Sequence, residues 1–128
     1  MKYTLVLSLF LLSIPGFSQT QAELNANSSQ KLKKIESELS AIENKILNEY
    51  KEDKEFVSMF TQAQEKWKEY RDAQLRMKYP KRSPGWYGSN HSMCINLYLT
   101  QLNRDRIEFL NEWLRVSEEG DACRGSVK

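Results

Sequence analysis

The most constraining feature of the sequence is an apolar stripe with strict helical spacing in its first half. Leucine and isoleucine recur every three or four residues, at Leu32, Ile35, Leu39, Ile42 and Ile46. This spacing puts all five side chains on one face of an α-helix, as packing along another helix requires. We expect a helix from about Ala22 or Ser29 to Tyr50. A polar turn follows at residues 51–54, in which Asp53 is a candidate N-cap.

Two later stretches repeat this spacing. The first has apolar or aromatic residues at steps of four and three, broken only by one glutamine: Phe56, Phe60, Ala63, Trp67, Tyr70, Gln74 and Met77. Prolines and glycines between residues 80 and 88 end it, because proline lacks an amide hydrogen and glycine loosens the backbone. Ser89, Asn90 or Ser92 can cap the last stretch, which runs through Ile95, Leu99, Leu102, Phe109, Leu110, Trp113 and Val116. Gly120 is its expected stop.

No strand pattern accompanies these helices, and five glycines and three prolines are too few for a many-turned β-sandwich. The sequence therefore predicts an all-α fold, an elongated antiparallel three-helix bundle with a long loop between its second and third helices. A chain of 128 residues has room for one ordinary domain, which we place at residues 19–128.

Residues 1–18 have the pattern of a secretory signal peptide. Lys2 precedes an apolar run that Pro15 and Gly16 break, and small residues stand before a cut at Gln19. A cut after Ala22 is the alternative. The run is shorter than the roughly 20 residues of a spanning helix, so we expect a periplasmic or secreted protein without stable membrane insertion after cleavage.

Export changes the expectation for the two cysteines, Cys94 and Cys123. An isolated pair in an oxidising compartment usually forms a disulfide. Such a bond would tie the C-terminal tail back to the helices, and two free thiols are the alternative.

The sequence gives little sign of catalysis. One histidine, His91, excludes a multi-histidine metal site within one chain, and the carboxylates are dispersed among lysines in the usual solvated pattern. We predict no catalytic residue, metal or cofactor, and interpret His91 as a solvated residue in a first helical turn; a base for a hydrolase is the weaker alternative. A net charge of +2 also argues against nucleic-acid binding.

The connection from Lys78 to Asn90 is the candidate binding surface. It combines cations with aromatic residues and is longer than a bundle needs, and such loops are often functional. Tryptophan and tyrosine offer large contact areas to a protein partner or a sugar ring. The candidate partner-binding residues are Lys81, Arg82, Trp86, Tyr87 and Ser89. Alternatively, Trp86 and Tyr87 only cover the open end of the bundle.

A second constellation combines Arg71 and Asp72 with Arg104 and Arg106. An arginine on the inner face of a bundle needs an oxygen partner. We therefore expect an arginine–aspartate fork across the second and third helices, joined by Gln64. Binding of an anionic ligand by Arg106 is the alternative.

These residues resemble the LprI-type lysozyme inhibitor N-terminal domain family over about residues 56–114. The resemblance rests on Ala-Gln-Glu-Lys-Trp-Lys-Glu-Tyr-Arg-Asp-Ala at 63–73, on Gly88-Ser89, and on the segment 102–110. The matching motif residues are Gln64, Trp67, Tyr70, Arg71, Asp72 and Arg106. The resemblance implies a small exported helical domain with a protein partner, in some members a lysozyme or other glycan-cleaving enzyme.

The chain departs from the family pattern at its cysteines. Leu75 stands at the family's first cysteine position, and either Tyr98 or Cys94 stands at the second, depending on the alignment. The usual family disulfide cannot form in either case. With the resemblance, the first function hypothesis is an exported cell-envelope binding protein that inhibits lysozyme through the loop at residues 78–90. The alternative is a periplasmic structural or interaction module without inhibitory activity, which assembles with itself or with another envelope protein through an exposed face of the first helix.

Overall fold

Local capping signals set where the first two helices begin. The computed structural model describes residues 19–128, and its first helix, α1, spans Gln21–Glu49. Thr20 and Glu23 form a capping box there, in which each side chain accepts a hydrogen bond from the other residue's backbone amide. The second helix, α2, spans Lys54–Lys78, and Asp53 accepts a hydrogen bond from the Phe56 amide at 3.0 Å. The predicted N-cap is therefore confirmed.

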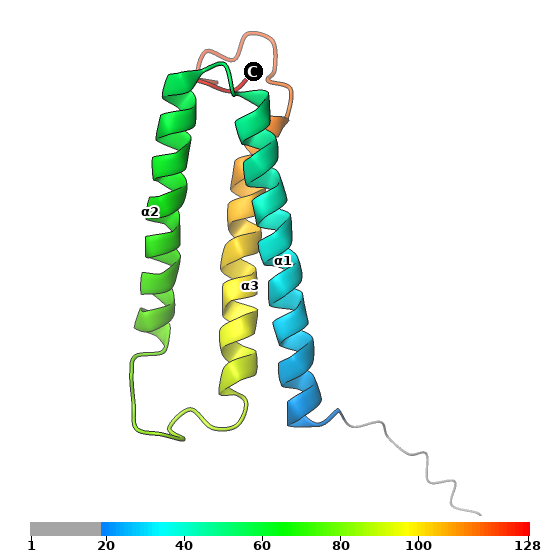
Figure 1. Ribbon diagram of the computed structural model, residues 1–128, viewed down its shortest axis with the longest axis vertical. Helices are drawn as coiled ribbons and strands as arrows, with labels where there is room; N and C mark the ends of the chain where they lie inside the picture. The colour runs from blue at the N-terminus through cyan, green and yellow to red at the C-terminus, as the bar shows by residue number, and fades with distance from the viewer. Residues whose placement is uncertain (1–18) are drawn as a thin grey trace, which may run out of the picture.

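The three helices run alternately up and down (Figure 1). The third helix, α3, spans His91–Leu110 and continues as a 3₁₀ turn, η1, over Asn111–Leu114. No strand occurs within residues 19–128, so the all-α bundle is confirmed. In the same residues no helix has both the length and the apolar content that a membrane span needs. The predicted signal peptide lies outside the described residues.

The apolar stripe of α1 packs against α3, and these two helices form the closest pair. Ile46 is 0% exposed, and Ile35 and Leu39 are also buried. Tyr50, Phe60 and Leu110 complete the apolar core at the end of the bundle that holds the C-terminus. Because the stripe faces inward, it does not provide the exposed face on which the interaction-module hypothesis depended.

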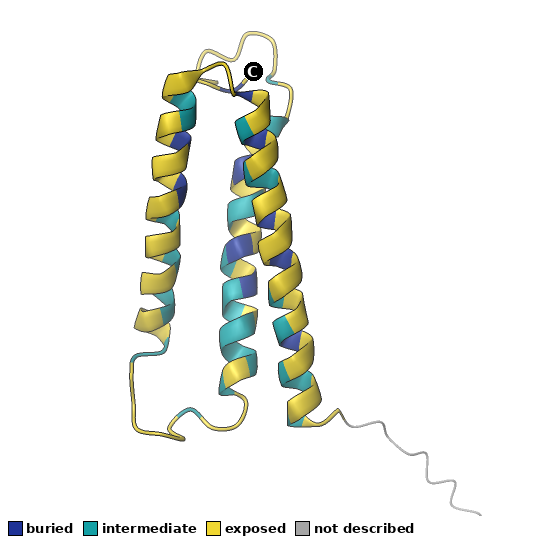
Figure 2. Cartoon of the chain, viewed as in Figure 1, coloured by how far each residue is buried: buried dark blue, intermediate teal, exposed yellow. Residues whose placement is uncertain are grey.

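Helix α2 is the least covered of the three, as its mostly exposed surface in Figure 2 shows. Phe60 and Gln64 are its buried residues, whereas Tyr70 is 56% exposed and Met77 is more open still. The predicted apolar face of this helix is therefore buried only in the half that begins at Phe56.

The third helix ends at Leu110, ten residues before the predicted stop at Gly120. The 3₁₀ turn η1 then ends at Leu114, and the Trp113 carbonyl within it accepts a hydrogen bond from the Tyr50 hydroxyl at 3.1 Å. The Ser117 amide donates to the carbonyl of Lys128. Contacts with the C-terminal tail thus replace the last helical turns, and Val116, which fits the helical pattern, is 94% exposed.

The predicted Cys94–Cys123 disulfide is wrong, because both cysteines are free. Cys94 lies in the first turn of α3, whereas the tail that follows η1 and contains Cys123 lies at the other end of the bundle. Along α3 alone the chain rises about 24 Å from Cys94 to Leu110, whereas a disulfide needs Cα atoms within about 7 Å. The tail is held without it, since the Lys128 amide donates to the Tyr50 hydroxyl at 3.1 Å.

Candidate functional site

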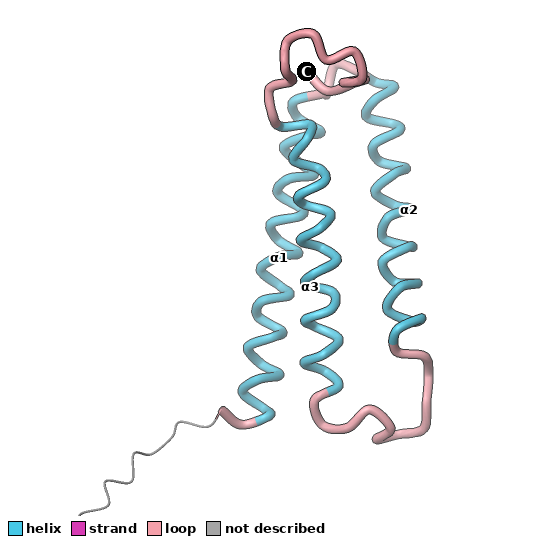
Figure 3. Tube along the Cα trace, turned by 180° about the vertical axis from the view of Figure 1, so that it is seen from behind, coloured by secondary structure: helices cyan, strands magenta, loops and turns pink. Residues whose placement is uncertain are grey.

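The connection between α2 and α3 forms one end of the bundle, away from the C-terminus (Figure 3). Two glycines shape its turns, because Gly85 and Gly88 have φ angles of 80° and 78°, which favour glycine. Short hydrogen-bonded steps follow one another, from the Trp86 amide to the Ser83 carbonyl and from the Gly88 amide to the Gly85 carbonyl. Asn90 occupies the cap position of α3, without a side-chain capping bond.

An aromatic cluster holds this loop against the helices. The Tyr87 ring stacks on His91 with centroids 4.4 Å apart, and Tyr79 meets both rings edge-on. The Tyr87 hydroxyl donates a hydrogen bond to the Pro80 carbonyl at 2.6 Å. The pKa of the Tyr79 hydroxyl is raised above its ordinary value, mainly by burial and to a smaller extent by the neighbouring Cys94. The Tyr87 side chain therefore holds the loop against Pro80, near the point where the loop begins.

The interpretation of His91 as a solvated residue is wrong, although it does begin α3 as expected. His91 is only partly exposed, between Tyr79 and Tyr87, and its Nδ1 atom is buried without a hydrogen-bond partner in the described chain. Packing of the loop against the ring explains this burial.

The exposed part of the loop carries the other candidate residues. Trp86 is 67% exposed, and Lys81, Arg82 and Ser89 are exposed as well. Lys81, Arg82 and Trp86 line a shallow hollow of about 300 Å³, which Ser89 does not line. The structure thus gathers two cations and an open indole on one surface, which can contact a partner through charge and through stacking.

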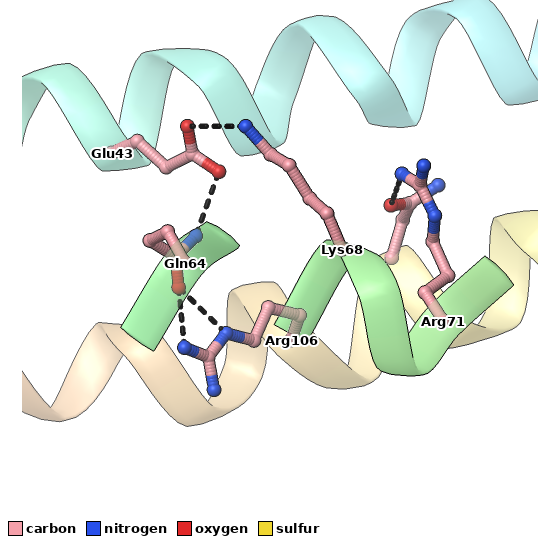
Figure 4. Close-up of polar contacts among 6 residues, drawn as sticks. Glu43, Gln64, Lys68, Arg71 and Arg106 are labelled. Atoms are coloured by element: carbon pink, nitrogen blue, oxygen red, sulfur yellow. Dashed lines mark hydrogen bonds and ion pairs between the residues drawn. The ribbon is translucent and has the colours of Figure 1, made fainter. Parts of the chain in front are cut away.

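The second constellation forms a polar connection through all three helices, with Gln64 of α2 at its centre (Figure 4). The Gln64 Nε2 atom donates to the Glu43 carboxylate of α1 at 2.7 Å, and its Oε1 atom accepts from the Arg106 Nε of α3 at 2.8 Å. Lys68 lies 3.8 Å from the same carboxylate. Gln64 therefore links an anion and a cation that do not touch each other.

Two arginines flank the Trp67 ring, with the guanidinium carbons of Arg71 and Arg106 5.5 and 5.6 Å from its centroid. Burial lowers the pKa of Arg106, and Glu43 partly opposes this shift. Both arginines thus combine hydrogen bonding with stacking, a role that lysine does not reproduce.

The predicted fork across helices is only partly correct. Arg106 crosses from α3 to Gln64, but Asp72 stays on α2 and binds the neighbouring Arg71 at 3.0 Å. The crossing carboxylate is Glu43, which the sequence reasoning missed. Glu43 stands four residues after Leu39 and three before Ile46, on the flank of the buried stripe, and that position was the available signal.

In the comparison with family models, residues 16–110 match the family described as Lysozyme inhibitor LprI. The matched region covers α1, α2 and α3 and includes both the loop and the three-helix polar connection. It begins well before the segment on which the sequence resemblance rested. Neither the curated proteins nor the solved structures that were compared give a match.

Proposed function

The chain belongs to the LprI lysozyme inhibitor family, and from this premise we propose that it inhibits a lysozyme or another glycan-cleaving enzyme through the loop between α2 and α3. We also propose that it is exported to the periplasm or secreted, since residues 1–18 have the signal-peptide pattern. The observation that carries the proposal is the exposed Trp86 beside Lys81 and Arg82 on a loop fixed by its own turns.

The chemistry of a glycosidase cleft explains why this loop fits. Such clefts place two carboxyl groups around the scissile bond. Lys81 and Arg82 offer positive charge to these carboxylates, and the Trp86 indole offers a flat apolar face where a sugar ring would bind. A near-neutral protein can therefore engage such an enzyme whatever its net charge, because the complementary charge is local to the cleft.

The rest of the molecule keeps the loop ready for binding. Tyr87 fastens the loop through the Pro80 carbonyl, and the aromatic cluster of Tyr79 and His91 supports it from below. A loop that is ordered before binding loses less conformational entropy in the complex. The motif residues Gln64, Arg71 and Arg106 contact one another or Trp67 between the helices, so we assign them a structural role.

We expect Trp86→Ala to weaken inhibition about 30-fold, as loss of a central aromatic contact worth about 2 kcal/mol would. Arg82→Glu should weaken inhibition more than Trp86→Ala does, because it places an anion against the carboxylates of the cleft. The measurement is the lysis of a cell-wall suspension, followed by turbidity, with lysozymes of several classes and increasing amounts of the protein.

Lys51→Glu is the matched control, since this exposed lysine lies in the α1–α2 turn at the opposite end of the bundle. It changes the net charge as Arg82→Glu does and should leave inhibition unchanged. Complete lysis by every lysozyme in a large molar excess of the protein, with no complex on size exclusion, would refute the proposal.

A further inference from the structure

A groove between α2 and α3 lies outside the loop and is unused by the proposed function. It has a volume of about 530 Å³ and is lined mainly by apolar side chains, among them Phe56, Phe60, Phe109 and Trp113. Phe109 is 53% exposed, and Met59 beside it is also exposed. Open aromatic surface of this kind is unfavourable in water unless something covers it.

The groove has an apolar end and a cationic end. Helices α2 and α3 run in opposite directions, so Phe56 near the start of α2 and Trp113 after α3 share one end. Lys66 and Arg106 line the groove further along the same two elements. Along the chain Arg106 precedes Trp113 by about 10 Å of helical rise. Both lining cations therefore lie toward one end of an apolar channel.

The two cations are available to a ligand. Among the described residues 19–128, Lys66 pairs only with Glu69, at 3.0 Å, and both side chains are largely exposed, so this ion pair contributes little stability. Arg106 donates to the neutral amide oxygen of Gln64, and no carboxylate within residues 19–128 forms an ion pair with it. Figure 4 shows its third nitrogen directed away from Gln64.

We infer that this groove binds an amphiphile with one alkyl chain and an anionic head group. The alkyl chain lies against Phe109 and the aromatic residues of α2, where it covers the exposed apolar surface. The anionic head meets Arg106 and Lys66, whose charges match it. A cationic head would be repelled by Arg106 and Lys66, and a neutral head would gain no ionic contact from them, so the charge arrangement selects the ligand class.

Titration calorimetry with dodecanoate, below the concentration at which it forms micelles, tests this inference. We expect saturable binding of one dodecanoate per chain, and no comparable binding of dodecyltrimethylammonium, which has the same chain and the opposite charge. Ala63→Trp should abolish binding, because Ala63 is an exposed residue of α2 that lines the groove. Lys66→Glu should weaken it about tenfold by removing one charge-assisted contact.

Matched controls separate the groove from general effects. Ala73→Trp makes the same change at an exposed position of α2 outside the groove, and Lys33→Glu reverses a charge on the exposed face of α1. Both should bind dodecanoate as the unmodified protein does. Absence of saturable binding, equal binding of the cationic amphiphile, or unchanged binding by Ala63→Trp overturns the inference. The inference is also overturned if the protein binds no dodecanoate and forms a dimer that Ala63→Trp dissociates. The occupant of the groove would then be a second copy of the chain.

Discussion

Replacing Ile46 by alanine lowers the free energy of unfolding by about 3 kcal/mol, as truncation of a fully buried aliphatic side chain does. Ile46 is 0% exposed and belongs to the core cluster with Leu39, Tyr50 and Leu110. The helices around it cannot collapse into the space freely, because the Tyr50 hydroxyl is bonded to the Trp113 carbonyl. Urea denaturation followed by circular dichroism measures the change.

Val116→Ala is the control for this experiment, since Val116 has the same kind of side chain but is 94% exposed. Its free energy of unfolding should stay within about 0.5 kcal/mol of the unmodified protein. A loss below about 1 kcal/mol for Ile46→Ala would contradict the placement of this residue in the core.

Replacing Gln64 by leucine lowers the free energy of unfolding by about 2 kcal/mol. The change removes the amide that bonds both Glu43 and Arg106, and bonds to charged groups are among the strongest in proteins. Both ions retain some contact with water, which keeps the loss below that of a fully buried pair. The measurement is again urea denaturation.

Two further variants locate this effect. Gln62→Leu removes an exposed glutamine whose side chain donates to the Ser58 hydroxyl, so it should change the free energy of unfolding by less than about 0.5 kcal/mol. Gln64→Leu combined with Arg106→Leu should be more stable than Gln64→Leu alone, because the cation left without its oxygen is gone. A double variant no more stable than the single would show that Arg106 does not depend on Gln64.

The helices themselves could be predicted because their spacing and caps are local properties of the chain. The stripe from Leu32 to Ile46 fixes one face of α1, and Asp53 marks the start of α2. The end of α3 could not be predicted in this way. From η1 onward the chain makes contacts with residues far away in the sequence, since the Trp113 carbonyl accepts from the Tyr50 hydroxyl and the Ser117 amide donates to the Lys128 carbonyl.

The candidate site, like the helices, could be predicted only in part from the sequence. Composition alone was enough to single out Trp86, Lys81 and Arg82 as residues of a long loop. It could not separate the exposed Trp86 from Tyr87, which turns inward to bond Pro80, because both are aromatic neighbours. Glu43 was missed because a charged residue beside an apolar stripe usually points to solvent. The disulfide failed for a related reason, since redox chemistry says nothing about which ends of the fold the cysteines occupy.

The limited cover of α2 has a consequence for the motions of the molecule. Segments with few buried contacts open at lower free energy than the core, so the backbone amides in the second half of α2 exchange with solvent before those of α1. The long connection begins directly after that half. The loop that carries Trp86 therefore joins α3, which packs against α1, to the less covered half of α2, so it can shift with that half while α1 and α3 stay packed.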